Sequence, residues 1–150
     1  MTLSVLISIQ SSAYRDDSTE VEALQLLVPG EMELSDDKRT AVLRYEETID
    51  KDVPPQQVTV TVTDDSITVD RYGEYASLLF FKNANSFQTV YHTPVGDMDV
   101  AVYCTYLKIQ LDEYGGTLAM RYQLDLNNQF AAMHETEMTI APAMNSGLTE

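Results

Sequence analysis

Apolar and polar residues alternate with a period of two along most of this chain, which is the pattern of half-buried β-strands. The first segment places Leu3, Val5, Ile7 and Ile9 on one side of such a strand. The same period returns at 24–34, 58–62, 67–69, 98–104, 107–111, 118–126 and 130–140. Helical spacing of apolar residues is nearly absent. The chain is therefore predicted to be all-β.

Short polar segments separate the predicted strands. Residues 64–65, Asp-Asp, lie between two runs of Val, Ile and Thr, which indicates a hairpin. Gly-Gly at 115–116 and Asn-Asn at 127–128 indicate tight turns, because both residue types accept positive φ. Pro-Gly at 29–30 interrupts a long strand, where we expect a bend or a bulge.

About 8–10 strands at this spacing in one chain indicate a single domain. Because nearly every strand alternates, we predict one closed antiparallel β-barrel, which also leaves no exposed sheet edge. Residues 1–140 are expected to form the barrel, and residues 141–150 a flexible C-terminal tail. The segment Ala76–Phe81 is apolar on both faces, so the tail or a second subunit must cover its outer face. Of these two we favour a homodimer.

The charge balance narrows the choice of partners. The chain has 9 Lys and Arg residues against 24 Asp and Glu residues, a net charge of −15. Such an acidic chain is not expected to bind nucleic acid or an anionic membrane surface, because both carry negative charge. Its N-terminus lacks the basic start and continuous apolar run of a signal peptide, and it has a single cysteine. We therefore expect a cytoplasmic protein without a membrane partner.

Two long segments carry a family resemblance. Residues 22–48 contain "PGEMEL" and "LRYEE", and residues 91–129 contain "TPVGDMDV" and "LAMRYQLDLNN". In this order they resemble the YwiB-like family of uncharacterised cytosolic bacterial proteins. The resemblance implies a calycin-type barrel, related in shape to lipocalins and fatty-acid-binding proteins. It implies no catalytic residue, and the ligand cavity that such a fold implies is an argument from analogy.

Five side chains on the predicted strands are the candidates for lining a cavity. Arg71 shares a face with Ile67 and Val69, so it needs a carboxylate from the protein or from a ligand. His134 is either a core histidine bonded to Thr136 or a tyrosine, or a polar anchor for a ligand. The remaining candidates are tyrosines, which serve either as core residues or as ligand-orienting groups: Tyr45, Tyr91 and Tyr122.

Other reactive residues have a simpler interpretation. His92 lies near Asp97 and Asp99, but Pro94 and Gly96 between them indicate a turn rather than a metal site. Cys104 shares an apolar face and has no feature that would make it a thiolate. The chain contains no nucleotide-binding, hydrolase or metalloprotease motif. We expect no catalytic residue, metal or cofactor. An enzyme whose catalytic residues meet in the barrel mouth is a third and less favoured hypothesis.

These observations leave two main hypotheses. In the first, the protein is a non-enzymatic cytosolic barrel that binds a small, largely apolar ligand, with Arg71 holding an acidic headgroup. In the second, the barrel is filled by its own side chains and the protein is an interaction module with an acidic surface. The volume of the barrel interior separates the two.

Overall fold

The computed structural model describes residues 2–15, 20–48 and 51–143, and every regular element in them is a β-strand. The first half contains β1 (Thr2–Tyr14), β2 (Glu20–Leu34), β3 (Ala41–Glu47), β4 (Gln56–Val62) and β5 (Ser66–Tyr72). The second half contains β6 (Ser77–Lys82), β7 (Ser86–Thr93), β8 (Gly96–Asp112), β9 (Gly115–Leu126) and β10 (Gln129–Pro142).

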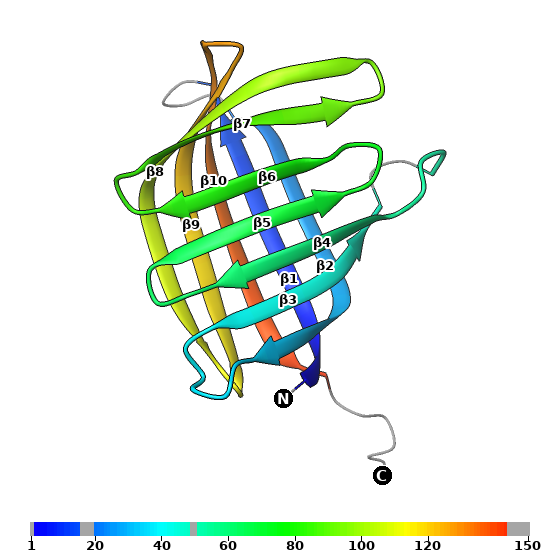
Figure 1. Ribbon diagram of the computed structural model, residues 1–150, viewed down its shortest axis with the longest axis vertical. Helices are drawn as coiled ribbons and strands as arrows, with labels where there is room; N and C mark the ends of the chain where they lie inside the picture. The colour runs from blue at the N-terminus through cyan, green and yellow to red at the C-terminus, as the bar shows by residue number, and fades with distance from the viewer. Residues whose placement is uncertain (1, 16–19, 49–50, 144–150) are drawn as a thin grey trace.

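The strands form one antiparallel sheet in the order β6-β5-β4-β3-β2-β1-β10-β9-β8-β7. Two meanders, β1 to β6 and β7 to β10, are joined because the first strand pairs with the last, from Val5↔Pro142 to Tyr14↔Met133. Figure 1 shows β3 to β6 crossing in front of the steeper strands β1, β9 and β10, so the sheet is rolled into an orthogonal barrel. The predicted all-β antiparallel barrel is confirmed, with 10 strands.

The barrel is nearly closed where its two edge strands, β6 and β7, meet. Ala76 and His92 form an isolated bridge, with N–H···O distances of 3.0 and 2.9 Å. At the other end, the amide of Ala84 donates to the carbonyl of Cys104 at 2.9 Å. Between these two points the rings of Phe80 and Phe87 lie 5.8 Å apart. Side chains, rather than a continuous hydrogen-bonded ladder, therefore hold this side of the barrel together.

Alternation decides which side chains fill the core. In β4, Val58, Val60 and Val62 are buried, while Thr59 and Thr61 between them are only partly covered. The β-branched residues suit the pleated surface and fix its buried face. The same rule places the largest fully buried side chains in the interior: Phe81, Ile7, Met32, Leu43, Ile67, Leu118 and Ile140.

Three register shifts interrupt the ladders of the described strands. One lies between Ala13 and Tyr14, and the other two change which side chains face the core, where the sequence pattern gives no warning. A register shift between Cys104 and Tyr106 lets residues on either side of it, such as Val102 and Leu107, both pack against the core. A second shift, between Phe130 and Ala132, turns Phe130 outward. The prediction that Phe130 shares the face of His134 is wrong, since an extra residue reverses every side chain beyond it.

The predicted turns are found, with one displacement. Asn127 and Asn128 have φ values of 50° and 66° in the turn between β9 and β10. Residues 63–65 connect β4 to β5, as the sequence predicts. The turn predicted at 115–116 lies instead at 113–114, and the two glycines begin β9. They are needed there because the backbones of β8 and β10 lie too close for a side chain.

Strand β2 bends but does not bulge at Pro29–Gly30. Its pairing with β1 continues without a shift through Leu6↔Pro29, whereas its pairing with β3 begins only at Gly30↔Tyr45. Figure 1 shows β2 curving between β1 and β3, and Gly30 is the residue at which the pairing of β2 with β3 begins. A Cβ atom at this position would lie 2.6 Å from the carbonyl oxygen of Arg44 and 2.9 Å from the side chain of Ile7.

The ends of the domain differ slightly from the prediction. Strand β10 continues through Ala141 and Pro142, which pair with β1, two residues past the predicted end of the barrel. Most of the predicted tail, residues 144–150, lies outside the described residues. No helix in the described part of the chain could span a membrane.

Gly30→Ala should lower the free energy of unfolding by about 1–3 kcal/mol, because the methyl group has no room between three strands. Urea denaturation followed by far-ultraviolet circular dichroism measures this. Ser4→Ala, at an exposed position on β1, is the control and should change the value by less than about 0.5 kcal/mol. A Gly30→Ala variant as stable as the wild type would contradict the tight packing at the bend.

Candidate functional site

A cavity of about 390 Å³ opens at one end of the barrel. It lies within the range of roughly 300–1,000 Å³ usual for small-molecule pockets, so the barrel is not filled by its own side chains there. The apolar part of its wall consists of Leu79, Met98, Val100, Leu124 and Leu126. The polar part consists of Glu47, Gln56, Arg71, Ser77, Thr89, Tyr91, Tyr122 and His134.

A smaller space of about 100 Å³ adjoins this cavity. The two share four wall residues: Glu47, Arg71, Leu79 and Tyr122. The smaller space reaches among core side chains, including Tyr45, Phe81 and Met120. All five residues predicted as cavity lining, Tyr45, Arg71, Tyr91, Tyr122 and His134, lie in one or both walls. Their role in binding a ligand stays a prediction.

Arg71 and Glu47 form an ion pair between the two spaces. The Nε atom of Arg71 donates to Oε1 of Glu47 at 3.0 Å, and the two side chains are 28% and 17% exposed. Arg71 is near the end of β5 and Glu47 ends β3, so the arginine side chain reaches across the intervening strand β4. Arg71 was predicted to need a carboxylate from the protein or from a ligand, and the structure shows that Glu47 of the protein provides one.

The protonation states around this pair follow from burial and charge. Burial lowers the pKa of Arg71, but the nearby Glu47 and tyrosines raise it by a larger amount. The pKa of Arg71 is therefore raised overall, and the guanidinium stays charged. Burial raises the pKa of the Tyr45 hydroxyl to about 12, with Arg71 opposing the shift and Glu47 adding to it. The site therefore presents one cation, one anion and a neutral phenol near neutral pH.

Aromatic rings form the opposite wall. Tyr122 and His134 are directly paired across β9 and β10, and their rings stack with centroids 5.0 Å apart and an angle of 7°. Tyr122 also contacts Phe81, at 4.7 Å between centroids. This contact and the stack fix the ring of Tyr122 in the wall.

Tyr91 comes from the other edge of the barrel, on β7. It is partly buried and its ring lies 6.4 Å from that of Tyr75. Burial raises the pKa of Tyr91, partly offset by Arg71. A neutral hydroxyl at the cavity wall can both donate and accept a hydrogen bond.

Four polar residues of the cavity wall escaped the sequence analysis: Glu47, Gln56, Ser77 and Thr89. Of these, Glu47 forms the ion pair with Arg71. Gln56 is 1% exposed, donates to the carbonyl of Tyr75 at 2.8 Å and accepts from the amide of Tyr75 at 2.6 Å. Glu47 lies two residues after Tyr45 and Gln56 lies two residues before Val58, so the alternation along each strand already placed them on the inward face.

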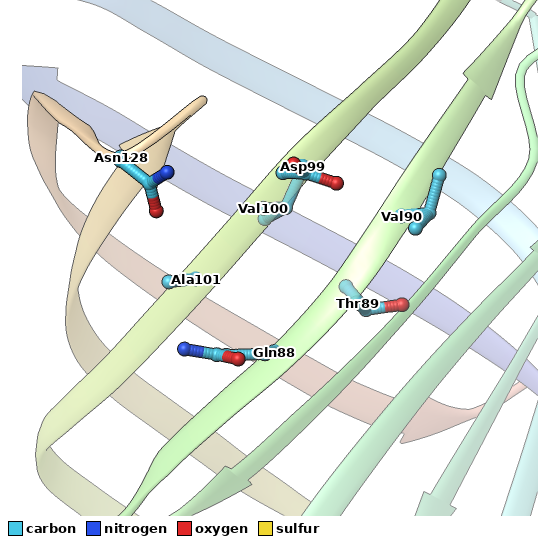
Figure 2. A pocket seen from close by; sticks show the side chains of 7 residues that line it. All are labelled: Gln88, Thr89, Val90, Asp99, Val100, Ala101 and Asn128. Atoms are coloured by element: carbon cyan, nitrogen blue, oxygen red, sulfur yellow. The ribbon is translucent and has the colours of Figure 1, made fainter.

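A second hollow, of about 340 Å³, lies along β7 and β8 and shares Thr89 and Val100 with the wall of the cavity (Figure 2). It is lined by Gln88, Thr89 and Val90 of β7, by Asp99, Val100 and Ala101 of β8, and by Asn128. Asp99 is its single ionisable residue, and none of the five candidate residues belongs to it. This hollow therefore has no pair of opposite charges such as Arg71 and Glu47 form in the barrel mouth.

The other reactive residues occupy structural positions. His92 Nδ1 and Asp97 Oδ1 lie 3.0 Å apart across the predicted turn, and both side chains are exposed. Cys104 is fully buried, and burial raises the pKa of its thiol. Within residues 2–15, 20–48 and 51–143, no three His, Cys, Asp or Glu side chains converge in a group that would hold a metal.

A nearly closed, ten-stranded antiparallel barrel with a cavity at one end belongs to the calycin-like class of folds. Residues 7–140 match a family profile, and the chain belongs to that family, which is described as a domain of unknown function, DUF1934. The structure is also similar to the crystal structure of the ywiB protein from Bacillus subtilis, with a TM-score of 0.80. The two chains are 18% identical, and the match covers 95% of this chain and 94% of that one. The predicted family resemblance is thus confirmed, while no curated protein matches the chain.

The Arg71–Glu47 pair should be energetically coupled, because both groups are largely shielded from water. A double-mutant cycle with Arg71→Gln and Glu47→Gln, read by urea denaturation, should give a coupling of about 1–2 kcal/mol. The exposed pair Arg44–Glu33, at 3.1 Å, is a matched control and should give less than about 1 kcal/mol. Equal coupling in the two pairs would contradict a shielded site.

Proposed function

We propose that this protein is a non-enzymatic cytoplasmic barrel that binds a small, largely apolar ligand in the cavity at its mouth. The observation that carries the proposal is the cavity of about 390 Å³, with an aliphatic wall and a single cluster of charged and hydroxyl groups. Pockets of this design orient a ligand through a few polar contacts while apolar burial provides most of the affinity. The single buried thiol and the acidic charge support a location in the cytoplasm.

The binding residues in this proposal fall into two groups. Leu79, Leu124 and Leu126 would contact the apolar body of the ligand. Arg71, together with Tyr45, Tyr91, Tyr122 and His134, would contact its polar end. The acidic headgroup predicted for Arg71 would have to compete with Glu47, which already occupies Nε of the guanidinium.

The alternative is an interaction module with a filled barrel and an acidic surface. A barrel filled by its own side chains would leave little space at its mouth, whereas the pocket there has a volume of about 390 Å³ and an apolar wall. The size of this cavity favours ligand binding over the filled barrel. The net charge of −15 remains compatible with a basic protein partner in either case.

Leu126→Trp should abolish ligand binding, because the larger ring occupies the cavity that Leu126 lines. A neutral naphthylamine dye, whose emission rises in apolar surroundings, is titrated into the wild type and the variant. The wild type should enhance the emission and Leu126→Trp should not. Leu6→Trp, on the outer face of β1, makes the same substitution at an exposed site and should bind as the wild type does. Absence of binding to the wild type, or equal binding by Leu126→Trp, would overturn the proposal.

We also propose that two copies associate through the outer face of β6, in the segment Ala76–Phe81. Leu78 on this face is 39% exposed, Phe80 is partly exposed, and the strand itself carries no acidic residue. A net charge of −15 repels a second copy from most of the surface, so the segment Ala76–Phe81, which has no charged residue, is where self-association is least opposed.

Leu78→Lys should convert a dimer to a monomer, since each copy would place a charge in the apolar contact. Native mass spectrometry and light scattering across a range of concentrations measure the subunit count. Thr61→Lys, on the outer side of β4, adds the same charge elsewhere and should leave the dimer intact. A monomeric wild type, or a dimer that survives Leu78→Lys, would contradict this contact.

A further inference from the structure

We propose that the cavity selects ligands whose polar head is uncharged and carries both a hydrogen-bond donor and a hydrogen-bond acceptor, as a primary amide does. This inference rests on the proposed binding function and specifies the chemical class of the ligand. It departs from the expectation of an acidic headgroup, for which a lone arginine would be the receptor.

The polar cluster presents opposite charges side by side. Arg71 and Glu47 line both parts of the cavity and are joined by the contact of 3.0 Å from Nε to Oε1. Among the described residues, this is the one hydrogen bond that either side chain makes. The terminal amino groups of the guanidinium and the second carboxylate oxygen are therefore available to a ligand.

The pair as a whole has no net charge, and this decides which head it attracts. A ligand carboxylate near Arg71 would also lie near Glu47, whose repulsion offsets most of the attraction at similar distances. An alkylammonium head near Glu47 would also lie near Arg71, whose positive charge would repel it. The charge of −15 on the whole chain adds a further, more distant penalty for an anion.

An amide head satisfies both partners without carrying a charge. Its carbonyl oxygen can accept from a terminal N–H of Arg71, and its N–H can donate to the free oxygen of Glu47. Hydrogen bonds of this kind, with one charged partner, are stronger than those between neutral groups. The neighbouring hydroxyl of Tyr45 stays protonated near neutral pH and adds no competing charge. The ligand's apolar body would then lie along Leu79, Leu124 and Leu126.

The test compares octanamide, octanoate and octylamine, which share one chain length and differ in the head. Calorimetric titration of the wild type at neutral pH should show octanamide binding about tenfold more tightly than either charged compound. Glu47→Gln leaves Arg71 as an unbalanced cation, so octanoate should gain about tenfold in affinity and become the preferred ligand. Glu46→Gln removes one charge from the exposed side of the same strand and should leave the order unchanged.

The outcomes separate this inference from the proposed function. If octanoate binds the wild type best, the inference fails while ligand binding stands. If none of the three compounds binds, both fail. If Glu47→Gln does not fold, the order measured on the wild type still decides, and Arg71→Gln should remove the preference for the amide over octylamine.

Discussion

The pairing of the first strand with the last is the constraint on which the cavity depends. Strands β1 to β6 and β7 to β10 are two separate meanders, each stabilised by contacts that are local in sequence. The ladder between β1 and β10 brings them into one sheet, and ordering so distant a pair costs loop-closure entropy. The cavity wall needs both meanders, because Glu47 and Arg71 come from the first while Tyr91 and His134 come from the second.

The sequence predicted the fold well because strand alternation is a local signal. The period of two identified the buried faces of β1, β4 and β9, and no distant partner was needed to recognise them. It failed at the bulge between Phe130 and Ala132, where Phe130 was misplaced. A bulge is determined by the pairing between strands, so a pattern read along one strand does not contain it.

The candidate site was predicted in part, for a related reason. Arg71 stood out because it shares a strand face with Ile67 and Val69, and a charge there requires a partner. The choice between Glu46 and Glu47 as that partner depends on the register of three strands, β3, β4 and β5. The alternation along β3 favours Glu47, because Glu47 lies on the same strand face as the buried Leu43 and Tyr45. Its contact with Arg71 across β4, however, depends on how the three strands pair in the folded barrel.

The Arg71–Glu47 pair is difficult to explain as a stabilising feature. Replacing a shielded ion pair by apolar side chains of similar size is often neutral, or stabilising by about 1–4 kcal/mol. The neighbouring inward positions hold Val58 and Val69, so the same strands accept apolar residues there. The pair lines both parts of the cavity, and the hydrogen bond within the pair uses one nitrogen of the guanidinium and one oxygen of the carboxylate. An ion pair in this position is therefore the feature on which the proposed ligand recognition rests.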